Sequence, residues 1–283
     1  MKLQNSNSVV FIPDGINEEQ ALKRTTHLAL SAHQDDIELM AYKGIVECFG
    51  LKDKWFTGVV VTDGAGSSRS GLYENYSDEE MKSIRINEQK KAAFVGEYSA
   101  QLMLGYTSKQ VKDGKNTDVV KEIEKIILAT NPKIIYTHNL ADKHDTHCGV
   151  ATKVIQALRN IPKDKRPEKV YGCEVWRDLD WVCDEEKVFF DTSAHPNIAM
   201  SLTSVFDSQI VGGKRYDLAA EGRRVANATY SASHDVDTVT ALNYGMDLTP
   251  LIEDDKLDVI EYITGYIDRF KDDVKNRLLK VLK

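Results

Sequence analysis

The chain has 283 residues, of which 37 are Lys or Arg and 44 are Asp or Glu, so its formal net charge is −7. Hydrophobic residues make up 42% of it and are spread along its length, which excludes a largely disordered protein and allows a sizeable core. The acidic balance and the lack of a basic stretch argue against a nucleic-acid binder, and no apolar run is long enough to cross a membrane.

The N-terminus and the cysteines indicate the compartment. Residues 1–8 lack the apolar core of a signal peptide. The four cysteines, Cys48, Cys148, Cys173 and Cys183, form no CxxC pair and are too few for a disulfide scaffold. We therefore expect reduced thiols and a cytoplasmic protein.

The first part of the chain alternates between helix-like and strand-like segments. Residues 17–24 predict a short helix, and the apolar run over 26–32 is typical of a buried strand. Apolar residues at spacings of three and four predict a helix over 37–49, and residues 56–62 predict a second strand. Residues 63–77 are rich in Gly, Ser and Asn and predict a loop.

The middle of the chain continues this alternation. Ser77 predicts a helix N-cap with Glu80 as its capping-box partner, and the helix runs to about Gly96. The next expected elements are a strand over 101–104, a helix over 118–129, a strand over 133–137, a helix over 150–158 and a strand over 169–176. This order predicts a Rossmann-like α/β fold, with a mostly parallel sheet and helices on both faces.

The C-terminal third is less regular. Residues 186–191 predict a further strand, and residues 195–208 and 214–230 predict helices. Residues 255–282 predict an amphipathic helix. We expect this helix to pack on its own domain, with a subunit interface in a homo-oligomer as the alternative.

Four side chains that could bind a metal or carry a proton follow the first predicted strand: His33, Asp35, Asp36 and Glu38. In an open α/β sheet, ligands bind beyond the carboxyl ends of the strands. An imidazole and a carboxylate can bind zinc, and a second carboxylate beside them can take a proton from water. The alternative interpretation is a polar turn with an acidic helix start, which the helix dipole favours.

A second polar segment, residues 138–147, follows the strand predicted over 133–137 and contains three histidines and two aspartates. His144 and His147 are three residues apart, so one helical turn places them on the same side. Asp145 could orient one of these imidazoles through a hydrogen bond.

Together, the two segments offer His33, Asp36 and His147 as three metal ligands. Three protein ligands with one open position are typical of a catalytic zinc site, whereas structural zinc is usually held by four ligands.

These motifs resemble those of the PIG-L/LmbE-like family of zinc-dependent de-N-acetylases. The first stands as Ala32-His33-Gln34-Asp35-Asp36-Ile37-Glu38, with Gln34 in place of the common proline and the glutamate one position late. The second stands as His144-Asp145-Thr146-His147 with the family spacing. Val61-Thr62-Asp63-Gly64 and Arg85-Ile86-Asn87-Glu88 match the family's loop after the second strand and its Arg-x-x-Glu helix. All four lie in the expected order.

The resemblance implies specific roles. Zn²⁺, or Fe²⁺ or another divalent metal in the cell, is expected on His33, Asp36 and His147. Asp35 is implied as the general base that deprotonates the metal-bound water. His144 is implied as the group that stabilises the oxyanion or protonates the leaving amine.

Three further residues are candidates for substrate binding. The family's arginine tends to lie near the substrate, which implies Arg85. His234 lies in a polar segment of the C-terminal third, which in this family often closes the pocket. Trp176 could stack on a sugar ring, with a partly buried aromatic turn as the alternative.

The expected function is metal-dependent hydrolysis that removes an N-acetyl group from a small amino sugar or its conjugate. Hydrolysis of another small-molecule amide or of a phosphoester, and metal or sugar binding without turnover, are the alternatives. We expect one domain over 1–283, with a core over about 25–180 and a pocket-closing, helical extension over 181–283.

Overall fold

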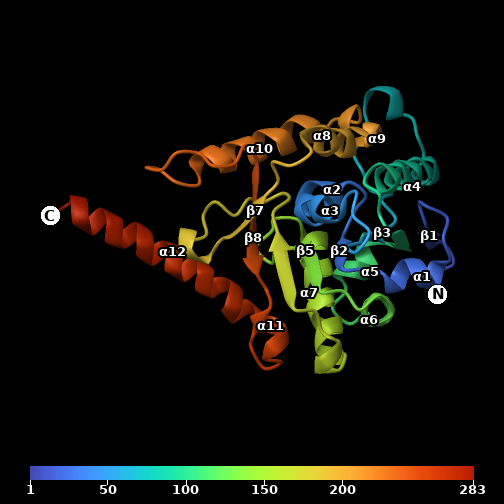
Figure 1. Cartoon of the computed structure of the whole chain (residues 1–283), viewed down its shortest axis with the longest axis horizontal. Helices are drawn as coiled ribbons and strands as arrows, with labels where there is room; N and C mark the ends of the chain where they lie inside the picture. The colour runs from blue at the N-terminus through green and yellow to red at the C-terminus, as the bar shows by residue number, and fades with distance from the viewer.

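Five short apolar runs form the parallel centre of an eight-stranded sheet in this computed structural model, which describes residues 1–283 (Figure 1). The strand order is β1-β4-β3-β2-β5-β6-β8-β7. The parallel strands are β2 (His27–Ser31), β3 (Phe56–Thr62), β4 (Ala100–Tyr106), β5 (Ile134–His138) and β6 (Lys169–Cys173). Antiparallel pairing adds β1 (Val9–Phe11) at one edge, and β8 (Leu242–Asp247) and β7 (Val188–Asp191) at the other.

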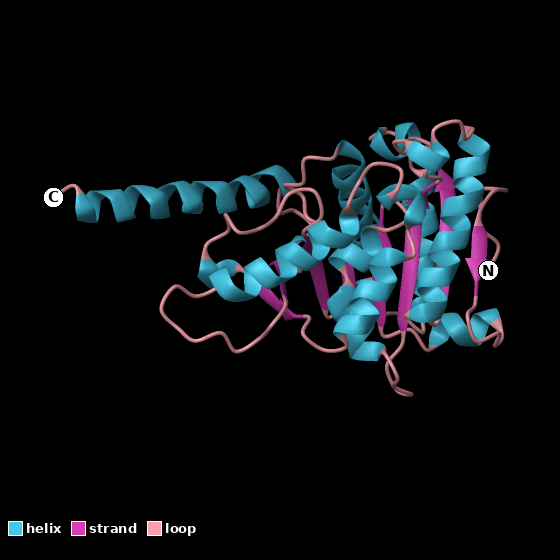
Figure 2. Ribbon diagram, turned by 90° about the horizontal axis from the view of Figure 1, so that it is seen from above, coloured by secondary structure: helices cyan, strands magenta, loops and turns pink.

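Helices cover both faces of this sheet, so the predicted fold class is confirmed (Figure 2). One layer contains α1 (Glu18–Lys23), α6 (Asp118–Thr130) and α7 (Asp145–Asn160). The other contains α2 (Asp36–Met40), α3 (Tyr42–Cys48), α4 (Asp78–Val95) and α8 (Pro196–Ser204). The remaining helices are α5 (Ser108–Lys112), α9 (Asp207–Ile210), α10 (Tyr216–Tyr230), α11 (Pro250–Glu253) and α12 (Val259–Val281).

The side chains of each central strand alternate between two apolar clusters, one on each face of the sheet. In β2, Leu28 and Leu30 belong to the cluster under α6 and α7, whereas Ala29 belongs to the cluster under α2 and α3. All three are fully buried. Burial on both faces explains why the strand is a continuous apolar run.

Several predicted boundaries differ from the structure. The capping box of Ser77 and Glu80 is confirmed at the start of α4. The helix predicted over 37–49 is two helices, because the backbone leaves the helical conformation at Ala41. The helix predicted over 150–158 begins earlier, at Asp145, so that His147 lies in its first turn.

The C-terminal third contains more sheet than the sequence predicts. Residues 186–191 do contain β7, but β8 was not predicted, because Asn243 and Gly245 interrupt its apolar pattern. β1 was also missed, since it has only three residues. The helical segment predicted over 195–208 is divided into α8 and α9.

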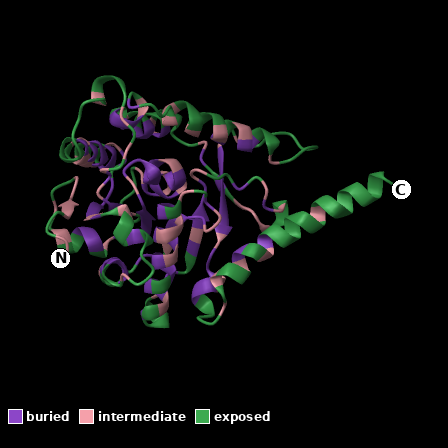
Figure 3. Cartoon of the chain, turned by 180° about the vertical axis from the view of Figure 1, so that it is seen from behind, coloured by how far each residue is buried: buried purple, intermediate pink, exposed green.

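The expectation that the last helix packs on its own domain is wrong for most of its length. In α12, only Ile263 and Tyr266 are buried. Beyond them the helix projects away from the body of the protein and is exposed on nearly all sides (Figures 2 and 3). No helix of the structure is long and apolar enough to cross a membrane.

The buried carboxylate of Glu174 joins the C-terminal third to the core. It accepts hydrogen bonds from the backbone N–H groups of Leu179 and Tyr244 and from the side-chain amides of Asn227 and Asn243. These donors come from the segment after β6, from α10 and from β8. A buried carboxylate is stabilised only by such donors, so this residue holds three segments in one arrangement.

We expect Glu174→Gln to destabilise the protein by about 1–3 kcal/mol, because the amide group presents N–H donors to other donors. Urea unfolding measures this loss. Glu185→Gln is the matched control, since Glu185 is exposed and makes no recorded hydrogen bond; equal midpoints for the two variants would contradict the role given to Glu174.

Candidate active site

The two polar segments of the sequence meet because β2 and β5 are neighbours in the sheet. The two strands pair in parallel, with His27 opposite Ile134 and Ala29 opposite Tyr136. From β2 the chain continues through β3 and β4 on one side, and from β5 through β6 on the other. The carboxyl ends of β2 and β5 therefore form the switch point of the sheet, where open α/β folds bind their ligands.

A short turn after β2 carries three of the predicted site residues. The backbone N–H of His33 donates to Oδ2 of Asp36 at 2.7 Å, which closes the turn. Between them, Asp35 has φ 98° and ψ −33°, in the left-handed half of backbone space that non-glycine residues avoid. Such strain persists where surrounding contacts hold it, and it concentrates at functional sites.

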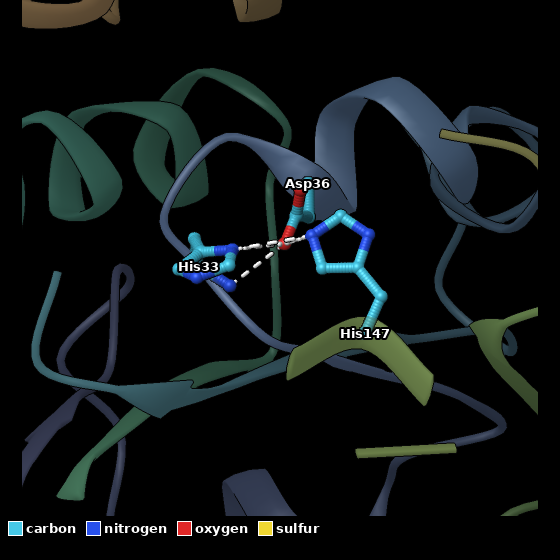
Figure 4. Close-up of side chains that lie close together, drawn as sticks. All are labelled: His33, Asp36 and His147. Atoms are coloured by element: carbon cyan, nitrogen blue, oxygen red, sulfur yellow. Dashed lines mark hydrogen bonds and ion pairs between the residues drawn. The ribbon is translucent and has the colours of Figure 1, made fainter. Parts of the chain in front are cut away.

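His33, Asp36 and His147 present three ligand atoms to one point (Figure 4). Nδ1 of His33 lies 3.2 Å from Oδ2 of Asp36 and 3.2 Å from Nε2 of His147, and the last two atoms are 3.4 Å apart. Zinc bonds of about 2.0–2.1 Å at tetrahedral angles place ligand atoms roughly 3.3–3.4 Å apart. The donor set and its spacing thus fit a divalent metal.

Asp142 fixes the orientation of His147. Its Oδ2 lies 3.3 Å from Nδ1 of His147, which assigns the ring proton to Nδ1 and leaves the lone pair of Nε2 free. The same carboxylate accepts the backbone N–H groups of His144 and Trp176. The sequence suggested Asp145 for this role, but Asp145 is exposed at the start of α7.

His138 supports the site but does not extend it. Its ring stacks on that of His147 at 3.9 Å between centroids, and its Nε2 accepts the backbone N–H of Ala32 at 2.8 Å. His138, Asp142 and His147 also lie close together. Nε2 of His138 and Nδ1 of His147 already have partners, so we assign this second group a supporting role.

Arg85 and Glu88 of α4 connect the turn to α9. The buried guanidinium of Arg85 donates to the carbonyl oxygens of Gln34 at 2.6 Å and Gly64 at 3.2 Å. The Glu88 carboxylate accepts the backbone N–H and the hydroxyl of Ser208 at 2.7 and 2.6 Å. The Arg-x-x-Glu pair therefore positions two walls of the site.

Asp35 lies beside Arg85, with 3.5 Å between Oδ2 and Nη2. Burial raises the pKa of Asp35 well above its ordinary value, and Arg85 offsets part of that rise. Asp36 has the opposite electrostatics: burial opposes its ionisation, but the imidazoles of His147, His138 and His33 hold its pKa below the ordinary value. Two adjacent carboxyl groups thus have different environments.

The histidines also differ from one another. Burial lowers the pKa of His33 and of His144, which favours their neutral forms. For His147, burial acts in the same direction, but Asp36 and Asp142 raise its pKa above the ordinary value. The His144 ring lies 4.5 Å from that of His147, and its Nδ1 is buried without a partner.

A cavity of about 360 Å³ opens over these residues. It is lined by His33, Asp35, Asp36, Gly64, Gly66, Ser67, Ser68, Arg85, Ser108, Lys112, His144, Thr146, Trp176, Gln209, Lys214 and Tyr216. His147 lies beneath its floor. The Gly- and Ser-rich loop after β3, which the sequence predicted as a loop, thus forms part of the rim.

Of the residues predicted to bind the metal, to act in catalysis or to bind the substrate, the structure brings together all but His234. Trp176 and Arg85 line the cavity, whereas His234 is exposed in the segment after α10 and does not line it. The sequence analysis missed Tyr216 and Lys214, because a helical pattern does not show which end of the helix faces a site. The Tyr216 ring packs edge-on against Trp176, and the Lys214 ammonium lies 5.0 Å from the Trp176 ring centre.

The fold and the site define an open α/β protein with a cluster of three potential metal ligands at the switch point of its sheet. Residues 28–158, which contain that cluster, match the family model described as PIG-L: GlcNAc-PI de-N-acetylase. Over these residues the chain is similar to the PIG-L family, in agreement with the resemblance of its motifs. Comparison with curated proteins gives no significant sequence match.

Solved structures share the fold at low sequence identity. The N,N'-diacetylchitobiose deacetylase of Pyrococcus horikoshii has a TM-score of 0.63 at 14% identity, covering 82% of this chain and 86% of its own. The 4-carboxy-2-hydroxymuconate hydratase GalB of Pseudomonas putida has 0.56 at 16%, covering 79% and 95%. A deacetylase of teicoplanin biosynthesis has 0.55 at 12%, covering 78% and 97%.

We expect metal-stripped protein to bind one equivalent of Zn²⁺, with a rise in melting temperature, because a ligand that binds only the folded state stabilises it. Calorimetric titration and thermal unfolding measure both effects. His147→Ala should abolish the binding, and His195→Ala, at an exposed position outside the cluster, should not. Two equivalents of tightly bound metal would contradict the single site.

Asp142→Asn should weaken the affinity for Zn²⁺ by about 10–100-fold, because the amide no longer holds the Nδ1 proton of His147 as a carboxylate does. The same titration measures this change. Asp145→Asn is the control, because Asp145 lies three residues further along the chain and is exposed. An equal loss of affinity in that variant would show that Asp142 has no special role.

Proposed function

We propose that this protein is a metal-dependent hydrolase that removes an N-acetyl group from an amino sugar or an amino-sugar conjugate. One observation carries the proposal: the turn after β2 presents two ligand atoms and the Asp35 carboxyl to the cavity that His144 also lines. The description of the matching family and the names of two of the structural neighbours support the choice of reaction.

The residues of the site fit the requirements of amide hydrolysis. A divalent ion held by His33, Asp36 and His147 would acidify water and polarise the acetyl carbonyl. Asp35 is the only carboxyl group beside that cluster that lines the cavity without being a ligand, so we assign it as the general base. Its carboxylate accepts a proton from the attacking water and then delivers it to the leaving nitrogen, which gives acetate and a free amine.

His144 and Arg85 have different parts in this proposal. His144 lines the cavity as a neutral imidazole, so it can donate an N–H to the carbonyl oxygen as negative charge develops there. The Arg85 guanidinium donates hydrogen bonds to the carbonyl oxygens of Gln34 and Gly64. Arg85 therefore positions the turn that carries Asp35, and it also lines the cavity.

The walls of the cavity suit a sugar. Trp176 offers an aromatic face on which a pyranose ring can stack, and Ser67, Ser68 and Gln209 offer hydrogen-bonding groups for hydroxyls. Gln209, Lys214 and Tyr216 come from the C-terminal third, so we include 181–283 in the functional domain as the part that closes the pocket. The proposal keeps a cytoplasmic location, which the composition and the four unpaired cysteines support.

The experiment that tests the function is an acetate-release assay with a panel of N-acetylated sugars and conjugates, run on protein whose metal content is measured. Release of acetate that stops with a chelator and returns with metal supports the proposal. Turnover of another amide, or hydration of a double bond as the hydratase neighbour would suggest, without acetate release would replace it.

Asp35→Asn should lower kcat by about 10²–10⁴-fold, the usual contribution of a general base, while the bound metal stays at one equivalent. Steady-state kinetics and metal analysis of the same sample measure both quantities. Asp164→Asn, at an exposed position far from the cavity, is the matched control. Full activity of a metal-loaded Asp35→Asn variant would show that the base is elsewhere.

A further inference from the structure

The projecting part of α12 carries an apolar face that is uncovered except where Phe270 contacts Trp181. Ile267, Val274 and Leu278 have 47%, 40% and 52% of their surface exposed. Ile260 and Val281 continue the same face at its two ends and are more exposed still. Single exposed apolar residues are common, but a continuous stripe of this length marks an interaction site.

The spacing of the stripe is that of a coiled coil. From Ile260 the apolar residues follow at intervals of three and four: Ile263, Ile267, Phe270 and Val274, then Leu278 and Val281. A seam with this period packs against another helix by inserting its side chains between those of the partner. Helices draw most of their stability from such packing. In α12 the packing on its own domain is confined to the buried Ile263 and Tyr266 and to the edge-on contact of Phe270 with Trp181.

Charge along α12 is strongly segregated. From its N-cap Asp258 to Asp273, the segment holds five acidic and two basic side chains. From Val274 to Lys283, it holds four basic side chains and no acidic one. Two such helices attract each other when they run antiparallel, because the basic tail of each can then lie along the part of the other that carries Glu261 and Asp268, and they repel when they run parallel.

We propose that α12 is a self-association surface that pairs antiparallel with α12 of a second copy of this chain. The pairing is isologous, since the same stripe serves both copies. A register that places Phe270 opposite Val274 of the second copy also brings Ile267 opposite the Arg277–Leu278 step of that copy. The body of each protein then lies at an opposite end of the paired helices, consistent with the projection of α12 (Figure 2).

The charged side chains beside the stripe are free to take part. Lys271 pairs with Asp268 and Arg277 with Asp273 within the helix, at 2.7 Å in each case, and all four side chains lie at the surface. Exposed ion pairs of this kind contribute little to stability, so exchanging them for pairs between two copies costs little.

The mass of the full-length protein in solution tests this proposal. We expect sedimentation or light scattering to give about twice the monomer mass of 31.9 kDa. Val274→Lys should raise the dissociation constant of the dimer by about a hundredfold or more, because it places an unpaired charge in the seam of each helix. Asn276→Lys adds the same side chain on the opposite, exposed face and should leave the dimer intact. A monomeric wild type, or equal effects of the two variants, would overturn the proposal.

Crosslinking distinguishes the two orientations. A carbodiimide joins a lysine to a carboxylate in direct contact, and a mixture of isotope-labelled and unlabelled protein identifies the links that form between copies. The antiparallel arrangement predicts links from Lys280 and Lys283 of one copy to Glu261 or Asp268 of the other. Dimers that form without any of these links would overturn the antiparallel pairing. Circular dichroism of each variant shows that the fold is unchanged.

Discussion

The site depends on one constraint, the parallel pairing of β2 with β5 at the point where the chain changes its direction across the sheet. Parallel strands end at the same edge of the sheet, so the pairing of β2 with β5 also brings together the segments that follow them. In this chain a turn with two ligands follows β2, and a loop leading into α7 and His147 follows β5. Any change that shifted the register of these strands by one residue would move the ligand atoms apart, since they approach within 3.4 Å.

Hydrogen bonds from the surrounding backbone and side chains hold this arrangement. The Ala32 N–H binds His138, the His33 N–H binds Asp36, and the Gln34 carbonyl accepts from Arg85, so three successive parts of the turn are each fixed by a different element. A site built on such a frame needs little rearrangement to bind a metal, and its groups keep their orientation during the reaction. The positive φ of Asp35 is a cost that these contacts offset.

The sequence alone could predict the features that depend on residues close together in the chain. Buried strands show as apolar runs, and the ligands lie within a few residues of strand ends, so β2, β5 and the metal cluster could all be predicted. Tyr216 could not, because its place in the cavity depends on how α10 packs across the sheet. β8 could not either, since its polar residues are satisfied by Glu174, a partner some 70 positions earlier in the chain. The projection of α12 is likewise a tertiary property, as an amphipathic pattern fixes a buried face but not its partner.

The residues that we assign to the proposed reaction and to substrate binding come from two regions of the chain. Residues 28–158, which match the family model, contain the three potential metal ligands, Asp35 and His144, to which we assign the chemistry of the proposed reaction. Four of the residues that line the cavity, Trp176, Gln209, Lys214 and Tyr216, come from later in the chain. Structural neighbours of this fold include enzymes named for quite different substrates, at 12–16% identity. The potential ligands lie at the switch point of the sheet, whereas these four residues belong to a separate stretch of the chain. Their side chains can therefore change without disturbing the ligands. We therefore expect the residues of α9 and α10 that line the cavity to determine substrate specificity. Glu88 holds α9 in place through Ser208, and Glu174 holds α10 in place through Asn227.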